Sequence, residues 1–403
     1  MSVRFNPFDE GFRRDPYPVY AALRTSDPVH RSFLDAWVVT RHADVRFVLK
    51  DRRFGVDPIP ERIAERHRLL AAKGQSLEAL LSASRRFFFF LDPPEHTRLR
   101  RLVQSLFTPV AVQKMLPIIA GYVDRLVDDL EGRTSFDLID DFAAPLPVTV
   151  IAAMLGVKGY DLRELKSWSL DLSRVLDPLV SLDEYRHMDD IVRGFEAIFR
   201  DVFAARGRHA EDDVTSALLA GAAEHNDLTE RDLAAICTVL FITGEETTVN
   251  LIGNGMLALQ RHPEARAKLQ ADPSLAESAI EELLRFESPV QLTTRVAHED
   301  VEIAGVRVSA GDKVVVGLGA ANRDPEVFDA PDELRLDRRP NPHMAFGDGI
   351  HYCLGAALAR AQGRLAIPKL LARFPTLRLD LDAPLQWRRN IVVRGLSELR
   401  ASV

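Results

Sequence analysis

Apolar residues recur at spacings of three and four along most of the chain, the pattern of helices that bury one face. This spacing holds in seven stretches, at 17–23, 43–49, 96–107, 121–130, 142–155, 191–203 and 274–286. Alternating strand patterns are fewer, at 37–40 and at 301–308, where a turn at Gly305 interrupts the second. The pattern predicts a mainly α fold with a minor β-sheet portion.

One predicted helix is much longer than the others. Thr229 followed by Asp232 has the form of a capping box, and the next break is Pro263, which predicts about 30 helical residues over 228–260. A helix of this length is expected to cross the whole core. No internal repeat and no Gly/Ser- or Pro-rich linker divides the sequence, so residues 1–403 are predicted to form a single domain.

Composition narrows the class of protein. Of the 403 residues, 46% are hydrophobic and 28% are charged, which is typical of a globular protein, and the net charge of −7 argues against nucleic-acid binding. The only cysteines, Cys237 and Cys353, lie far apart, which favours a reducing cytoplasm over a disulfide framework. No signal peptide and no run of about 18 apolar residues is found, so we expect a cytoplasmic protein without a membrane anchor.

The strongest chemical signal is the decapeptide FGDGIHYCLG at 346–355, which places Cys353 just before an apolar helical stretch. Backbone N–H groups at a helix start favour a thiolate, and a thiolate binds soft metal centres. The glycines would let the chain approach a flat ligand closely. An ordinary buried cysteine behind a Gly turn is one alternative, and a zinc site from His343, His351 and Cys353 is another. Cys237, in an apolar stretch, is predicted to be a packing residue.

This decapeptide resembles the haem-binding loop of the cytochromes P450, with Phe, two Gly, His, Cys and the last Gly in the same order. The resemblance implies the cytochrome P450 fold, haem b as cofactor and Cys353 as the iron ligand. It also implies that the following residues contact the cofactor: Phe346, Gly347, Gly349, His351 and Gly355.

Glu282 and Arg285 share one helix face, roughly 70 residues before Cys353. Such pairs are usually solvated and weak. In this position the pair resembles the Glu-x-x-Arg element of the same family, which ties its helix to the segment that holds the cofactor. The resemblance implies a third partner, either Arg338 or Arg339.

Thr243, Gly244, Glu246 and Thr247 interrupt an apolar helix face in the middle of the long helix. Gly lowers helix propensity by about 1 kcal/mol, and a threonine can bond the preceding turn, so we expect a local kink or opening. A packing glycine beside a solvent-facing acid pair would explain the pattern as well. The family resemblance implies that Glu246 and Thr247 are catalytic and deliver protons, and Thr243 stands where many relatives carry Ala.

His96 and Arg100 stand at i and i+4 and could reach one anionic group together. The resemblance assigns both to the haem propionates, along with Arg295 and His351, although each could instead be an ordinary surface charge. The predicted substrate pocket is mostly apolar, which implies a polyketide, terpenoid, steroid or fatty-acid-like substrate. Its candidate residues are Phe89, Leu240, Thr243, Gly244, Val290, Gln291 and Ile391.

The resemblance implies a monooxygenase that hydroxylates a hydrophobic small molecule with O2 and two electrons. No dinucleotide-binding fingerprint follows a strand, so the electrons are expected from a separate ferredoxin and its NAD(P)H-dependent reductase. Arg360 and Arg364 are the predicted docking residues. A peroxide-driven haem-thiolate hydroxylase and a non-catalytic haem sensor are the alternatives, and a monomer is expected.

Overall fold

The computed structural model describes residues 3–177, 179–223 and 228–403. Its contacts divide the chain into two compact units, each assembled from segments that are distant in sequence. The first unit contains Met1–Gly55, Met115–Leu146 and Thr247–Val403, and the second contains Val56–Lys114 and Pro147–Glu246. The expectation of a single domain stays a prediction.

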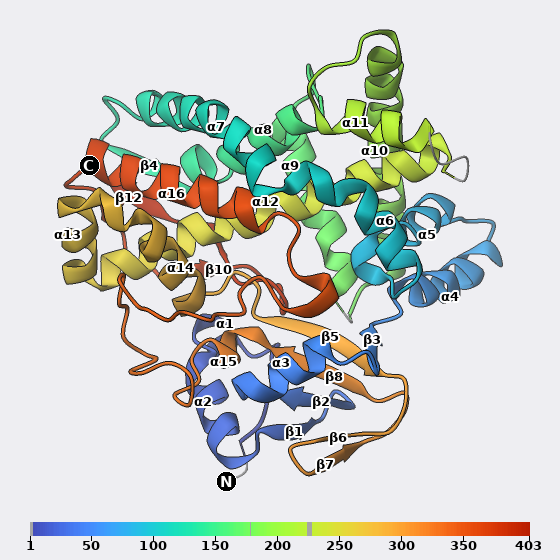
Figure 1. Ribbon diagram of the computed structural model, residues 1–403, viewed down its shortest axis with the longest axis horizontal. Helices are drawn as coiled ribbons and strands as arrows, with labels where there is room; N and C mark the ends of the chain where they lie inside the picture. The colour runs from blue at the N-terminus through green and yellow to red at the C-terminus, as the bar shows by residue number, and fades with distance from the viewer. Residues whose placement is uncertain (1–2, 178, 224–227) are drawn as a thin grey trace. The chain divides into compact units, whose positions relative to one another are not determined.

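A five-stranded sheet in the order β1-β2-β8-β5-β3 is the largest sheet among the described residues (Figure 1). Its strands are β1 (Val29–Ser32), β2 (Ala36–Val39), β3 (Phe54–Val56), β5 (Leu292–Ala297) and β8 (Lys313–Gly317). β1 and β2 form an antiparallel hairpin, β2 pairs in parallel with β8, and β8 pairs antiparallel with β5. Segments that are distant in the chain, at 29–56 and 292–317, therefore share one sheet.

Side chains along β8 point alternately to the two faces of this sheet, which explains why helices cover both faces. Val314 and Val316 pack with residues of α3 (His42–Lys50), whereas Val315 lies on the other side with residues of α1 (Glu10–Arg14) and α2 (Tyr17–Ser26). Successive side chains of a strand point to opposite faces, so an apolar run such as Val314–Val316 requires a cover on each side.

The rest of the first unit consists of helices, turns and short strands. They are β4 (Ser135–Asp137), the π-helical turn Leu138–Ala143, α13 (Pro263–Ala271), the 3-10 turn Pro273–Leu275, α14 (Ala276–Phe286), β6 (Val301–Ile303), β7 (Val306–Val308), α15 (Leu318–Ala321), the 3-10 turn Gly349–His351, α16 (Ala356–Arg373), β9 (Arg378–Leu379), β10 (Gln386–Trp387), β11 (Leu396–Glu398) and β12 (Arg400–Ser402). α14 packs against α16, which follows Cys353.

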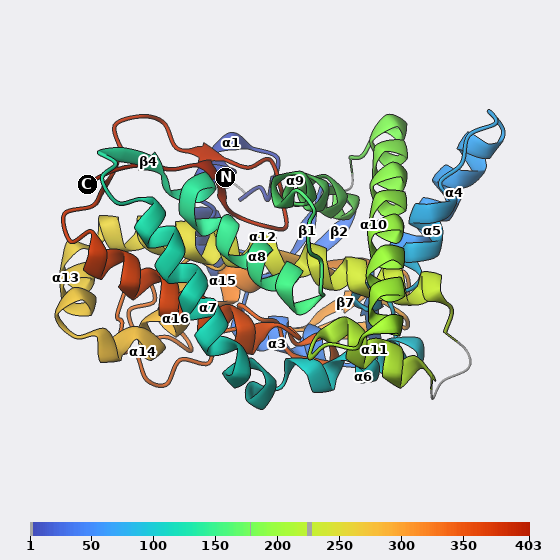
Figure 2. The same cartoon turned by 90° about the horizontal axis from the view of Figure 1, so that it is seen from above.

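The second unit is helical. It contains α4 (Ile59–Ala71), α5 (Glu78–Ser84), the 3-10 turn Phe88–Phe90, α6 (Glu95–Gln104), the 3-10 turn Ser105–Phe107, α9 (Leu162–Ser173), the 3-10 turn Arg174–Leu176, α10 (Leu182–Arg208) and α11 (Val214–Ala223). α10 contacts α5, α9 and α11, and Figure 2 shows it standing beside α5. Its apolar stripe, including Phe195, Phe199 and Phe203, is buried.

Three helices have residues in both units: α7 (Pro109–Asp129), α8 (Pro145–Met154) and α12 (Glu230–Arg261). The 32 residues of α12 confirm the long helix. Its capping box is also confirmed, because the Asp232 N–H donates to Thr229 Oγ1 at 3.2 Å while the Thr229 N–H donates to the Asp232 carboxylate at 2.9 Å.

Most predicted elements are confirmed, but two predicted helices are divided. In the stretch 96–107, α6 ends at Gln104 and the 3-10 turn Ser105–Phe107 follows. The stretch 142–155 is not one helix, because the π-helical turn ends at Ala143 and α8 begins at Pro145. Proline suits the first turn of a helix, where its missing N–H has no intrahelical partner. The turn within 301–308 is confirmed at Ala304 and Gly305, both of which have positive φ.

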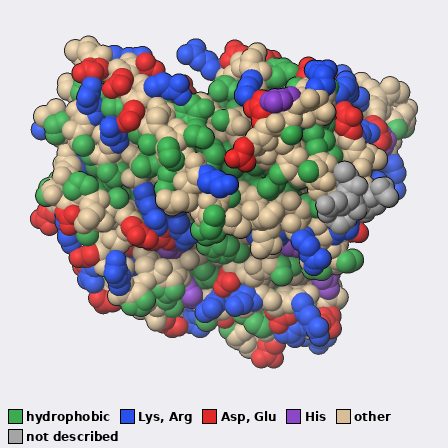
Figure 3. All heavy atoms as spheres, turned by 45° about the horizontal axis from the view of Figure 1, so that its top comes forward, with side chains coloured by type: hydrophobic (Ala, Val, Ile, Leu, Met, Phe, Trp, Pro, Cys, Tyr) green, Lys and Arg blue, Asp and Glu red, His purple; other side chains and the backbone are tan. Residues whose placement is uncertain are grey.

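α12 is the one described helix that by itself is long and apolar enough to cross a membrane, and 83% of its most apolar window is buried. The bent pair Glu95–Phe107 and Pro109–Asp129 passes the same test when counted as one span. Burial to this extent is also found in core helices of globular proteins. On the face drawn in Figure 3, basic and acidic side chains are interspersed, so this face carries no continuous basic surface.

Glu282 on α14 lies at the centre of a buried ionic network. Neither Glu282 nor Arg285 has exposed side-chain surface, and two 2.8 Å hydrogen bonds join the guanidinium to the carboxylate. Arg338 Nε lies 3.1 Å from both Glu282 oxygens, and Arg335 N–H and Asn341 Nδ2 also donate to the carboxylate. The alternative of a solvated pair is therefore wrong.

The same network settles which arginine is the third partner. Arg338 is buried and donates to Glu282, whereas Arg339 is exposed. Arg285 also donates to the carbonyl oxygens of Asn322 and Pro331. These bonds tie α14 to the segment that leads to Cys353, which is the structural role expected for the pair.

Replacing Glu282 with Gln should lower the free energy of unfolding by about 3–5 kcal/mol, because two buried guanidinium groups lose their counter-charge. Urea unfolding followed by circular dichroism would measure the change. Glu277→Gln is the matched control, since Glu277 forms only an exposed pair with Arg364 at 3.2 Å and should cost less than about 1 kcal/mol. Equal midpoints for the two variants would contradict the assigned role of Glu282.

Candidate active site

Residues 346–355, here called the Cys353 loop, contain one backbone hydrogen bond that positions the cysteine. The N–H of Cys353 donates to the carbonyl oxygen of Phe346 at 2.9 Å. Gly347 and Gly349 both have φ of +71°, which favours glycine. A Cβ at Gly349 would collide with the carbonyl oxygen of Leu49, so this position has no room for a side chain.

The surroundings of Cys353 suit a flat ligand that is bound through sulfur. The Cys353 side chain is exposed, and a Cβ at Gly347 or Gly355 would meet no atom within 4 Å. Gly355 is the N-cap of α16, and its carbonyl accepts from the N–H of Ala359 at 2.9 Å. The sulfur therefore lies near the positive end of an 18-residue helix, which stabilises negative charge. The donor set and the open glycine surface fit a haem iron.

Two alternatives for the cysteines and histidines can now be judged. Cys237 is fully buried, and burial raises the pKa of its thiol to about 12, which confirms that it is a packing residue. His343 uses both ring nitrogens within the protein, with Nε2 at 3.0 Å from Glu281 and Nδ1 accepting from the Ala345 N–H. In the described part of the chain no three His, Cys, Asp or Glu residues could hold a metal together. The zinc alternative therefore has no support.

Four residues were expected to bind anionic groups. His96 and Arg100 lie one turn apart on α6 in the second unit. Burial, followed by the charge of Arg100, lowers the pKa of His96 to about 4, so the imidazole is neutral at neutral pH. In the first unit, Arg295 on β5 is buried and donates to Thr293 Oγ1 and Thr294 O, and His351 is half-buried in the Cys353 loop. Their roles stay predictions.

The middle of α12 has three positions on one helix face that are not buried. From Asp232 to Leu259, all within the described chain, only Thr243, Gly244 and Thr247 are not buried. These positions are i, i+1 and i+4, so they share a face. The Thr243 hydroxyl donates to Val239 O at 2.6 Å, as expected, yet the helix continues without interruption. The expected kink stays a prediction.

Glu246, the predicted partner of Thr247, is 7% exposed. Gly244 allows α8 to approach, since a Cβ there would lie 3.2 Å from the Ile151 side chain. The close contact explains why this position is a glycine, and Thr247 beside it is half-buried.

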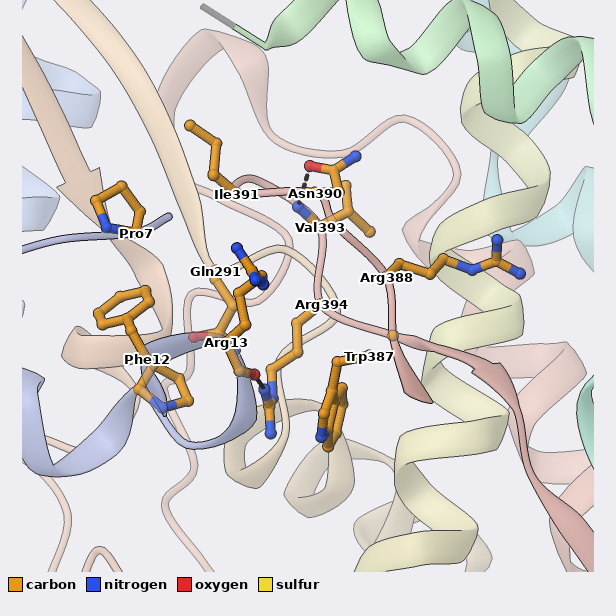
Figure 4. Close-up of a pocket in the computed structure, with 12 residues that line it drawn as sticks. Pro7, Phe12, Arg13, Gln291, Trp387, Arg388, Asn390, Ile391, Val393 and Arg394 are labelled. Atoms are coloured by element: carbon orange, nitrogen blue, oxygen red, sulfur yellow. Dashed lines mark hydrogen bonds between the residues drawn. The ribbon is translucent and has the colours of Figure 1, made fainter. Parts of the chain in front are cut away.

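Of the substrate-pocket candidates in the second unit, Phe89 is the one ring of Phe87–Phe90 that is not fully buried, whereas Leu240 is buried. In the first unit, Val290 bridges to Val393 and packs on the core. Gln291 and Ile391 line one crevice beside Phe12 and Trp387 (Figure 4). Its volume of about 20 Å³ suits roughly one water molecule. The pocket assignments stay predictions.

Sequence reasoning missed the role of Glu281. Its carboxylate accepts from Arg360 Nε at 2.7 Å and from Arg360 Nη2 at 2.8 Å. Arg364 pairs with Glu277. Both arginines are therefore paired with acids of α14, and their role in partner docking stays a prediction. The sequence signal for this role was the position of Glu281, an acidic residue directly before Glu282.

Comparison with known proteins places the chain in a family. Residues 73–389 match the family model for Cytochrome P450. The chain is 39% identical over 405 residues to the "Biotin biosynthesis cytochrome P450" of Bacillus subtilis (strain 168), covering 99% of each protein. It is 39% identical over 398 residues to the "Vitamin D(3) 25-hydroxylase" of Pseudonocardia autotrophica, covering 97% of this chain and 94% of that protein.

A solved structure has the same fold. The crystal structure of P450BioI in complex with hexadec-9Z-enoic acid ligated acyl carrier protein matches with a TM-score of 0.88 and 36% identity, covering 97% of this chain and 98% of that chain. The predicted fold class is confirmed. With a family match over most of its length and a relative named as a hydroxylase, the chain belongs to the cytochrome P450 family of haem-thiolate monooxygenases.

Proposed function

We propose that Cys353 is the thiolate ligand of haem b and that the enzyme hydroxylates a hydrophobic small molecule. The observation that carries the proposal is the Cys353 loop, where an exposed sulfur is held by the N–H bond to Phe346 O between glycines that leave open space. Bound haem supplies the oxidising power, and thiolate ligation favours cleavage of the O–O bond. The protein residues bind, orient and supply protons.

The haem propionates are assigned to His96, Arg100, Arg295 and His351. Guanidinium groups form short, charge-assisted hydrogen bonds with carboxylates, and Arg100 and Arg295 are cationic at neutral pH. His96 can donate a ring N–H to a propionate. Phe346, Gly347, Gly349 and Gly355 would shape the surface next to the ring.

Proton delivery is assigned to Glu246 and Thr247. Two protons are needed for one oxygen atom of O2 to leave as water. The hydroxyl of the half-buried Thr247 would donate to that oxygen, and the Glu246 carboxyl would replace the proton. This pair also argues against a peroxide-driven hydroxylase, which normally lacks it, and a haem sensor needs no proton relay at all.

The proposed substrate is a polyketide, terpenoid, steroid or fatty-acid-like molecule, and one similar protein is named for polyketide biosynthesis. The similar proteins include an enzyme named for vitamin D(3) and one solved with a hexadecenoyl acyl carrier protein. Members of the family receive electrons from redox partners. For this chain we propose a ferredoxin and an NAD(P)H-dependent ferredoxin reductase, in the cytoplasm.

Cys353→Ser should abolish the long-wavelength Soret band that a thiolate-ligated haem shows when it is reduced and bound to carbon monoxide. The serine oxygen is a harder and weaker ligand for this iron. Cys237→Ala is the matched control, because this thiol is buried and protonated, and it should keep the band. If Cys353→Ser kept the band, Cys353 would not be the ligand.

Thr247→Ala should keep substrate binding but uncouple electron use from hydroxylation. The product formed per NAD(P)H consumed should fall at least about tenfold, with hydrogen peroxide released instead, since the hydroxyl proton donor is missing. Binding is read from the low-spin to high-spin shift with a panel of fatty acids, steroids and macrolides. Thr248→Ala, at a buried neighbouring position, is the control. Equal coupling in Thr247→Ala and the parent would remove Thr247 from the mechanism.

A further inference from the structure

Glu281 holds the chain on both sides of Cys353, and the proposed function gives it no role. One carboxylate oxygen lies 3.0 Å from His343 Nε2 and accepts from Arg360 Nη2 at 2.8 Å. The other accepts from Arg360 Nε at 2.7 Å. His343 precedes Cys353 and Arg360 follows it on α16. A single carboxylate therefore joins the segment that enters the Cys353 loop to the helix that leaves it.

Arg360 also contacts two residues of the Cys353 loop itself. Its guanidinium lies over the Phe346 ring, 4.4 Å from the centroid, and its Nη1 donates to the Tyr352 hydroxyl at 3.2 Å. Phe346 supplies the carbonyl that accepts the Cys353 N–H, and Tyr352 is the residue before the cysteine. The positive charge of Arg360 is thus held against the two residues that frame the sulfur.

The charges in this cluster balance. Burial would raise the pKa of Glu281, but the hydrogen bonds from His343 and Arg360 lower it to about 2, so the carboxylate is ionised at neutral pH. His343 Nδ1 accepts from the Ala345 N–H, so Nε2 is the ring nitrogen that donates to Glu281. Glu281 and Arg360 then sum to zero charge. The pairs of Arg364 with Glu277 and Glu281, at 3.2 and 3.8 Å, lie further along α16.

Loss of the Glu281 charge would leave Arg360 uncompensated beside the loop. An added positive charge near a metal centre stabilises its reduced form, because reduction adds negative charge. A side chain that only filled space would not have this effect, and an exposed charge would be screened by solvent. The reduction potential therefore distinguishes an electrostatic role from a packing role.

We propose that Glu281 is a positioning residue that fixes both ends of the Cys353 loop and sets the electric field at the sulfur by neutralising Arg360. The inference rests on the proposed role of Cys353 as the haem ligand. It differs from the role of Glu282, which ties α14 to the segment further upstream.

The test compares charge variants of the haem-loaded enzyme. Glu281→Gln keeps the size of the side chain but removes its charge, and we expect the reduction equilibrium of the haem to shift at least about tenfold toward the reduced form, which is 59 mV for one electron. Arg360→Met should shift it in the opposite direction. In the double variant the charges balance again, so the potential should return close to that of the parent.

Glu277→Gln is the matched control, because it removes the same charge one turn earlier on α14 from an exposed pair, and its potential should equal that of the parent. The proposal is overturned if Glu281→Gln has the potential of Glu277→Gln, or if the double variant keeps the full shift of Glu281→Gln. If Glu281→Gln did not retain haem, Arg360→Met and the double variant could be compared instead, because they differ only in the charge at position 281. Equal reduction potentials for those two variants would overturn the proposal.

The Soret band of the reduced carbon monoxide complex separates this inference from the proposed function. A parent enzyme without the thiolate band would refute the role of Cys353. A parent with the band, together with an unshifted Glu281→Gln variant, would refute only the role of Glu281.

Discussion

An ionised carboxylate in a protein interior must be surrounded by donors, because leaving it without partners costs several kcal/mol. Glu282 meets this requirement with two arginines, an asparagine and a backbone N–H, all drawn from its own helix or from residues 335–341. Satisfying the carboxylate therefore fixes the path of an otherwise irregular segment. The Cys353 loop follows directly, so its starting point is set by the charge on α14.

The next carboxylate along α14 extends the same principle across the loop. Glu281 reaches His343 before the cysteine and Arg360 after it, so consecutive acids hold the segment at successive points. Between these contacts the loop makes its own turn, with the Cys353 N–H bonded to Phe346 O. The loop is thus fixed at both ends and has a hydrogen bond within it. This arrangement holds the Cys353 sulfur in one defined direction.

Local features were predictable from the sequence. The capping box of α12, the turn at Gly305 and the glycine pattern around Cys353 all depend on residues close together in the chain, where backbone geometry and side-chain chemistry act directly. The sequence also pointed to Thr243, Gly244 and Thr247, and these are the positions where the buried run of α12 is interrupted.

Contacts between residues far apart in the chain were not predictable in this way. Nothing local distinguishes Arg338 from Arg339, since only the approach of α14 decides which guanidinium is buried. The parallel pairing of β2 with β8 joins residues more than 270 positions apart, and periodicity carries no information about such partners. Glu281 was missed for the same reason, because its two partners follow it by 62 and 79 residues.

The three glycines of the Cys353 loop differ in what restricts them, which bears on how this enzyme could be diversified. At Gly349 the backbone of α3 blocks any larger residue, and at Gly347 the left-handed backbone is the obstacle while space is available. Gly355 has neither restriction within the protein itself. The haem ring proposed above would occupy the open space beside Gly347 and Gly355, so a side chain at 355 would meet the cofactor although it meets no protein atom. None of the three positions is therefore free to vary in the haem-loaded enzyme.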